Sequence, residues 1–157
     1  MAFNTERGSF GGTVVPRTDS NGKRWIKAKA HGDLTAKVPY AISGGASGLL
    51  TKAIFDTTYV STTGAAHANF YVGVPDDAIS SGTFGWLQIG GDVSSVTTPN
   101  SCTGVAGQTF RWKDASIVGS GTTDIGYFTD FAVCTTSTDD STTQHMFLLE
   151  RKVCGIT

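Results

Sequence analysis

The chain has 157 residues, the length of one ordinary domain that can bury a core without disulfides. Charged residues make up only 16% of it and the formal net charge is −1, which gives no excess of Lys and Arg to attract nucleic acid. No stretch approaches the roughly 18 to 20 apolar residues that cross a bilayer, and the N-terminus lacks a signal-peptide pattern, so we expect synthesis in a cytoplasm and no membrane partner.

The first 22 residues differ from the rest of the chain. They contain scattered apolar residues and glycines without the alternation of a strand, so we expect an extended N-terminal arm at 1–22 and a single domain at 23–157. An arm that becomes ordered on a partner and a disordered tail fit this composition equally well.

The charges are unevenly distributed along the chain. Residues 1–37 carry seven basic and three acidic side chains (+4), and residues 38–157 carry five basic and ten acidic ones (−5). Such asymmetry can orient a protein on a partner, although exposed charges usually only solvate a surface.

The segment KRWIKAKA at residues 23–30 alternates between two faces. Ile26, Ala28 and Ala30 fall on one face, and Trp25 lies among lysines on the other, as expected for a strand. The pattern therefore predicts a strand with a basic outer face. Trp25 is either packed by the lysine stems within the monomer or serves as an interface anchor, and the residues alone leave both alternatives open.

Seven further segments carry strand signals, and clusters of Gly, Ser, Thr and Asp separate them. The expected strands are residues 35–42, 49–56, 67–74, 84–91, 107–113, 124–133 and 145–153. The expected turns are residues 19–22, 43–48, 61–64, 75–82, 119–123 and 135–143, of which 75–82 is a helical turn or a loop. Short strands at this spacing predict an all-β fold, a small β-barrel or β-sandwich of about eight strands.

The segment FGWLQIGG has apolar residues on both of its faces. Leu87 and Ile89 share one face, and Phe84, Trp86 and Gln88 share the other. One face serves the core. The other is covered by a loop or by the arm within the monomer, or it forms an intersubunit contact, since Trp is a favoured interface anchor.

Two glycine-rich stretches have different expected roles. Gly90 and Gly91 close the FGWLQIGG segment, and they predict a bulge or sharp bend in the strand. GGASG at residues 44–48 lacks the lysine of a phosphate-binding loop and does not join a strand to a helix. We therefore interpret it as a hairpin turn.

Residue types that build catalytic or metal sites are scattered along the chain. Cys102, Cys134 and Cys154 form no CxxC pair and have no histidine beside them that completes a zinc site, so we expect buried free thiols. The histidines stand apart, only two glutamates occur, and there is no GxSxG elbow. The stretches PDD and TDD lack the ligand number and spacing of a calcium loop. The sequence therefore predicts a protein without enzymatic activity, cofactor or metal.

A series of short motifs occupies the second half of the chain. It contains GTFGWLQ from Gly82, GQTF from Gly107, DIG with Ile125 and Gly126, and FLLER with Leu148, Leu149 and Arg151. This series resembles the small β-barrel module of head decoration, or cement, proteins of tailed bacteriophages. The resemblance covers roughly residues 70–154, and GWLQ is its most distinctive part.

The resemblance implies a virion structural protein that binds the capsid exterior after the shell expands and clamps neighbouring subunits. The implied partners are the major capsid protein and other copies of the chain, as a homotrimer or another homo-oligomer, so that many weak contacts act together. The candidate capsid or oligomer interface consists of Phe3, Arg7, Phe10, Arg17, Lys23, Arg24, Trp25, Phe84, Trp86 and Gln88. Its basic members are expected to meet an acidic capsid surface.

Two other classes of function fit parts of the sequence. A phage tail or receptor-binding β module shares the Gly-, Ser- and Thr-rich composition, and it would bind host glycans instead of capsids. A hydrolase of cell-wall polymers requires two carboxyl groups about 5 to 10 Å apart in a groove. No motif in the sequence favours the hydrolase.

Overall fold

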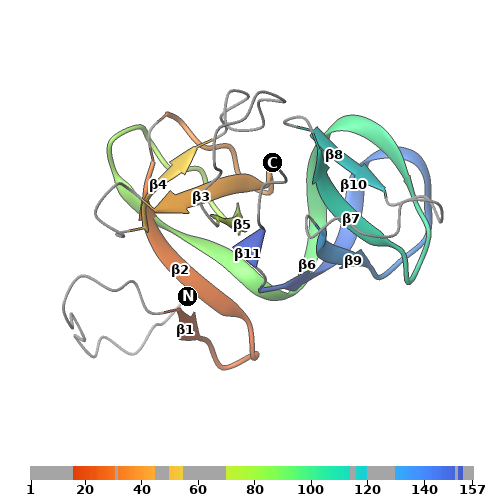
Figure 1. Cartoon of the computed structure of the whole chain (residues 1–157), viewed down its shortest axis with the longest axis horizontal. Coiled ribbons are helices and arrows are strands. Elements are labelled where there is room, and N and C mark those ends of the chain that lie inside the picture. Colours follow the sequence, from red (N-terminus) through yellow and green to blue (C-terminus); the bar gives the residue numbers. More distant parts are fainter. Residues whose placement is uncertain are drawn as a thin grey trace.

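The computed structural model describes residues 16–30, 32–44, 50–54, 70–113, 116–119, 130–150 and 152–153. Within these residues the regular structure is entirely antiparallel β, as Figure 1 shows, so the all-β prediction is confirmed. The strands are β1 (Arg17–Thr18), β2 (Arg24–Lys29), β3 (Tyr40–Gly44), β4 (Leu50–Ile54), β5 (Phe70–Pro75), β6 (Phe84–Gly104), β7 (Thr109–Lys113), β8 (Ser116–Gly119), β9 (Asp130–Cys134), β10 (Thr138–Leu149) and β11 (Lys152–Val153).

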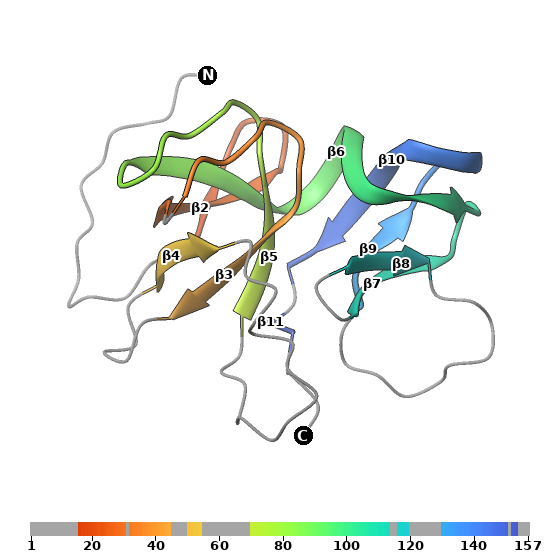
Figure 2. The ribbon, with the colours of Figure 1, turned by 90° about the horizontal axis from the view of Figure 1, so that it is seen from above.

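The strands form an open, strongly bent sheet. Hydrogen-bonded neighbours follow the order β4-β3-β5-β6-β10-β9-β7-β8, while β2 pairs with β1 and β6, and β11 pairs with β5. This path does not close into one barrel among the described strands. Figure 2 shows that β2 to β5 gather in one half of the molecule and β7 to β10 in the other, with β6 running through both halves.

Strand β6 is long because it serves both halves. From Phe84 to Gly90 it pairs with β2, and from Gly90 onward it pairs with β10. Gly91 has a φ of 90°, a conformation that a residue without a Cβ adopts readily, and the register with β2 shifts between Arg24 and Trp25. The bend predicted at the glycine pair is therefore confirmed.

A buried side chain stabilises this bend. The Nε2 of Gln88 donates hydrogen bonds to the carbonyl oxygens of Gly90 and Asp92, each at 3.0 Å. Gln88 is 1% exposed, so its amide group replaces the water that a bent backbone would otherwise bind. The side chain and the backbone irregularity therefore depend on each other.

The chain also crosses between the two halves at Glu150, directly after β10. The amide of Glu150 donates to the carbonyl of Ile89 at 2.9 Å, which holds the crossing against β6. The Glu150 carboxylate forms an ion pair with Arg24 of β2 at 3.0 Å. A further link joins the halves where the amide of Thr97 donates to the carbonyl of Lys37 at 2.8 Å. Several bonds therefore fix the relation between the halves.

Two clusters of buried apolar side chains fill the interior, and β5 separates them. One consists of Ile26, Ala28, Ala30, Leu34, Tyr40, Ile42, Ile79, Leu87 and Ile89. The other consists of Val72, Val74, Val93, Val96, Phe110, Phe131, Ala132, Cys134, Met146 and Leu148. Gly73 faces the first cluster, and a Cβ there would lie 2.6 Å from Cδ1 of Ile42 and 2.9 Å from Cβ of Leu87. Strand β5 is therefore a wall shared by two cores, and it needs a glycine to fit between them.

Several sequence-based boundaries were wrong. Residues 135–143, expected as a turn, belong to β10 from Thr138 onward, and β6 continues to Gly104, well past the expected end at 91. These Ser- and Thr-rich stretches pair with each other across register shifts, so tertiary pairing outweighed their turn-like composition. Residues 75–82, expected as a helical turn or a loop, contain no helix.

Other expectations concern residues that are only partly described. Cys134 is buried and free, as predicted, whereas Cys154 and the side chain of Cys102 lie outside the described residues. The division into an arm at 1–22 and a domain at 23–157 stays a prediction. Within the predicted arm, Arg17–Thr18 pairs with β2 as β1, and residues 1–15 lie outside the described part.

Replacing Gln88 by leucine should destabilise the fold. Leucine fills a similar volume but leaves the Gly90 and Asp92 carbonyls without their donor, at an expected cost of about 2 to 4 kcal/mol in the free energy of unfolding. Urea unfolding measures this. The matched control is Gln108→Leu in the turn before β7, where the side chain is partly exposed and a change within about 0.5 kcal/mol is expected. Equal losses in the two variants would contradict the role of Gln88.

Candidate functional site

The outer face of β2 and β6 carries cations beside aromatic rings. Lys27 lies directly across from Trp86, and Lys29 lies across from Phe84, so each pair shares one face of the sheet. Lys27 and Lys29 are exposed, and neither forms an ion pair within the described part of the chain. Phe84 is 58% exposed. The expected basic outer face of this strand is thus present, and aromatic side chains from β6 extend it.

Arg17 adds a third cation to this face. Its guanidinium carbon lies 5.6 Å from the centroid of the Trp86 ring, within the range of a cation–π interaction. Strand β1 brings it there by pairing with β2. Trp86 is half-buried, so the described end of the predicted arm covers part of the ring. We call Arg17, Lys27, Lys29, Phe84 and Trp86 the basic aromatic face.

An aspartate organises the turn that places Arg17. The Oδ1 of Asp19 accepts hydrogen bonds from the amides of Asn21 at 2.9 Å and Lys23 at 3.0 Å, and its Oδ2 accepts one from the indole Nε1 of Trp25 at 2.9 Å. Burial acts to raise the pKa of Asp19, but these three hydrogen bonds and the positive charge of Lys23 outweigh it. The pKa of Asp19 is therefore below its ordinary value of 3.8.

Three candidate interface residues have roles inside the molecule. Trp25 is 1% exposed and bonded to Asp19, so it is packed within the monomer. Gln88 is buried in the β6 bend, and Arg24 is paired with Glu150. Among the described candidates, Arg17, Phe84 and Trp86 remain on the outer face of the sheet. The interface assignment itself stays a prediction.

The other candidates divide into described and undescribed residues. Lys23 is partly buried beside Gly91, while Phe3, Arg7 and Phe10 lie outside the described residues. The sequence-based list of site residues omitted Lys27 and Lys29. The signal for them was the alternation in KRWIKAKA, which places both lysines on the outer face.

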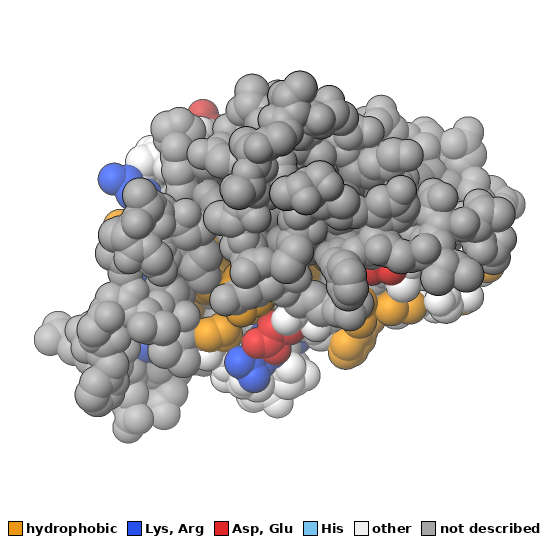
Figure 3. Space-filling model, in the orientation of Figure 1, with side chains coloured by type: hydrophobic (Ala, Val, Ile, Leu, Met, Phe, Trp, Pro, Cys, Tyr) orange, Lys and Arg blue, Asp and Glu red, His pale blue; other side chains and the backbone are white. Residues whose placement is uncertain are grey.

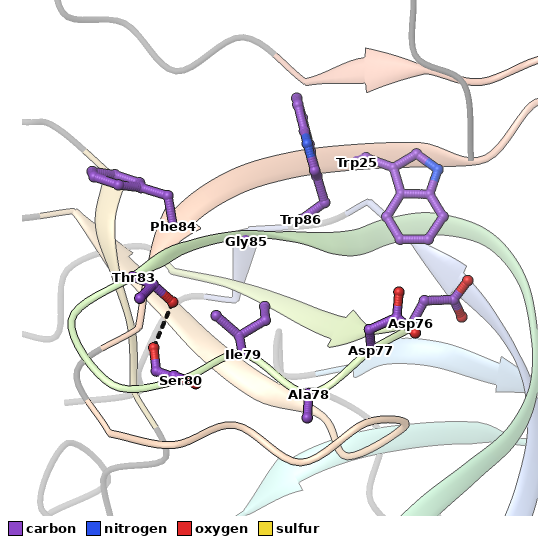
Figure 4. A pocket seen from close by; sticks show the side chains of 10 residues that line it. All are labelled: Trp25, Asp76, Asp77, Ala78, Ile79, Ser80, Thr83, Phe84, Gly85 and Trp86. Carbon is purple, nitrogen blue, oxygen red and sulfur yellow. Dashed lines mark hydrogen bonds between the residues drawn. The ribbon is translucent and has the colours of Figure 1, made fainter.

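A shallow pocket of about 380 Å³ adjoins the basic aromatic face. The loop at residues 76–83 forms its other wall, and Figure 4 shows the side chains of Asp76 and Asp77 on the side of that loop near Trp25. Ile79 packs beneath Gly85, where it leaves no room for a Cβ. The pocket floor is therefore fixed, and its walls differ chemically, with aromatic rings on β6 and carboxylates on the loop.

The loop is held by backbone bonds to the segment that follows β2. Leu34 and Ile79 exchange amide–carbonyl hydrogen bonds of 2.8 and 3.0 Å, and the amide of Ser81 donates to Oδ1 of Asp33 at 2.7 Å. These bonds form the wall of the pocket before any ligand binds. The pocket is preorganised in this respect.

The two carboxylates of the pocket differ in their partners. Asp76 forms an ion pair with the ammonium group of Lys37. Asp77 is exposed and has no hydrogen-bond or ion-pair partner within the described part of the chain. One carboxylate is therefore neutralised, and the other can accept hydrogen bonds from a ligand.

Other surface features lie apart from this site. Phe147 of β10 is 47% exposed and Val105 is 44% exposed. In Figure 3, apolar side chains of the described residues lie along the lower edge of the molecule, on both sides of adjoining acidic and basic groups.

Among the described residues no three His, Cys, Asp or Glu side chains gather as metal ligands. No helix with the length and apolarity to cross a bilayer occurs in the same residues.

The environment of Trp25 should change with pH as Asp19 titrates. A lowered carboxyl pKa means that the turn's stabilisation is complete above the ordinary pKa and is lost as pH falls through the lowered one. We expect the NMR shift of the Trp25 indole N–H to titrate with a midpoint below 3.8, and Asp19→Asn should abolish the transition. Asp33→Asn, which changes an exposed carboxylate in another loop, is the control and should leave it intact. A midpoint at or above 3.8 would contradict the assignment.

Comparison with known proteins yields one similar solved structure. The chain is similar to the head fiber gp8.5 N base of bacteriophage phi29, at 11% sequence identity and a TM-score of 0.45, over 82% of this chain and 96% of that one. No protein-family model matches the chain, and no curated protein sequence matches it.

Proposed function

We propose that the chain is a non-enzymatic structural protein of a phage virion, which binds the outside of the capsid through the basic aromatic face. The observation that carries the proposal is the position of Lys27 and Lys29, exposed and without ion-pair partners in the described structure, beside Phe84 and Trp86. The sequence resemblance to phage decoration proteins supports the same conclusion, because its most distinctive motif, GWLQ, contains Trp86.

The chemistry of this face selects an acidic partner. Surface lysines without carboxylate partners steer a negatively charged surface toward them and raise its association rate. The aromatic rings supply apolar area, and aromatic side chains together with arginine carry much of the binding energy in protein interfaces. A capsid surface with acidic side chains around an apolar depression complements both properties.

The described end of the predicted arm fits this assignment. It includes Arg17, which belongs to the basic aromatic face. The candidate arm residues Phe3, Arg7 and Phe10 would then extend the same contact across the capsid surface. We propose the major capsid protein as the partner and self-association, as a trimer or another oligomer, as the source of multivalent binding.

Reversing the two lysine charges should weaken binding to capsids. We expect the wild-type protein to cosediment saturably with expanded, undecorated phage heads, and Lys27→Glu/Lys29→Glu to bind at least about tenfold more weakly. Lys113→Glu on β7 is the control for a charge reversal in the other half of the molecule, and it should bind normally. Wild-type binding should also weaken as the salt concentration rises.

Two results would overturn the proposal. One is the absence of saturable binding by the wild-type protein, and the other is an unchanged affinity in the double variant. In the first case, binding of the protein to host cells would favour a tail or receptor-binding role.

A further inference from the structure

The pocket beside Phe84 combines aromatic rings with carboxylates. Its lining includes Phe84 and Trp86 of β6 and Asp77 of the 76–83 loop, and Figure 4 shows these side chains around the pocket. Lys27 and Lys29 of β2 lie across from the two aromatic residues and are outside this lining. A ligand in the pocket therefore meets apolar rings and the carboxylate of Asp77.

This arrangement discriminates between classes of ligand. An anion in the pocket would be repelled by the carboxylate of Asp77, and the Trp86 ring already has the guanidinium carbon of Arg17 at 5.6 Å from its centroid. A neutral ligand with hydroxyl groups avoids the repulsion from Asp77, and its hydroxyls can donate to that carboxylate.

The shape and lining of the pocket add a second restriction. A volume of about 380 Å³ lies within the usual range for small-molecule sites. The exposed ring of Phe84 and the half-buried ring of Trp86 offer flat apolar surfaces at its edge. A pyranose has one face rich in C–H groups, which packs on an aromatic ring, and a rim of hydroxyls.

We propose that this pocket binds a neutral saccharide ring, with Phe84 and Trp86 as the packing surface and Asp77 as the hydrogen-bond acceptor. Asp76 also lines the pocket, but its ion pair with Lys37 leaves Asp77 as the carboxylate that accepts from the sugar. The site does not depend on the capsid role, because it is complete in the free protein.

The test uses the free full-length protein and three probes: methyl β-glucopyranoside, methyl β-galactopyranoside and N-acetylglucosamine. We expect at least one of them to produce saturable NMR shift changes confined to residues 76–86 and the Trp86 indole. Phe84→Ala and Asp77→Asn should each weaken this binding about tenfold. Phe147→Ala and Asp92→Asn are the matched controls, another exposed aromatic and an exposed carboxylate, neither of which lines the pocket, and they should bind as the wild type does.

Three outcomes would overturn the proposal. The first is no saturable shift with any of the saccharides, and the second is binding that persists unchanged in Phe84→Ala and Asp77→Asn. The third is a response at the pocket to N-acetylarginine amide or to acetate but to none of the saccharides, which would make it an ion site. Because Asp77→Asn leaves Lys27 and Lys29 in place, capsid binding by that variant reports separately on the capsid role.

Discussion

The whole arrangement depends on one hydrogen-bonded bend in β6. A strand that pairs with β2 at one end and β10 at the other must turn between two cores, and turning detaches carbonyl groups from the ladder. Gln88 resolves this conflict, because its buried amide donates to both of the carbonyls that follow it. Gly91 supplies the backbone conformation that an ordinary residue would adopt only under strain.

The bend also determines how the two halves share their interior. Strand β5 turns Val72 and Val74 toward one core, and Gly73 faces the other at a distance too short for a side chain. Neither core is closed without this strand. Because Glu150 ties the end of β10 back to β2 through Arg24, the halves are joined by packing and by charge as well as by the chain. This coupling explains how a face built on β1, β2 and β6 keeps its geometry.

Much of the fold could be predicted from short-range patterns, and the errors have a common physical cause. Alternation in KRWIKAKA identified the basic outer face, and the glycine pair identified the bend. The Ser- and Thr-rich stretch that opens β10 was mistaken for a turn, since its strand form depends on pairing with a distant part of β6. Gln88 was a surface candidate because alternation placed it with Phe84 and Trp86, but alternation cannot reveal that a bend encloses its side chain.

The same reasoning explains why the candidate site lies where it does. Polar groups near the bend already have partners within the fold. Gln88 donates hydrogen bonds to two carbonyls, Arg24 forms an ion pair with Glu150, and Asp19 accepts three hydrogen bonds. Toward the start of β6, Trp86 and Phe84 follow Gln88 on the same face of the strand. Less of the fold covers them, so Trp86 is half-buried and Phe84 is exposed. Aromatic rings at such positions cost solubility without stabilising the interior, and Lys27 and Lys29 beside them raise the local charge, since neither forms an ion pair with another described residue. Such a surface is unfavourable for the isolated molecule in both respects, and this is the physical basis of the partner that we propose for it.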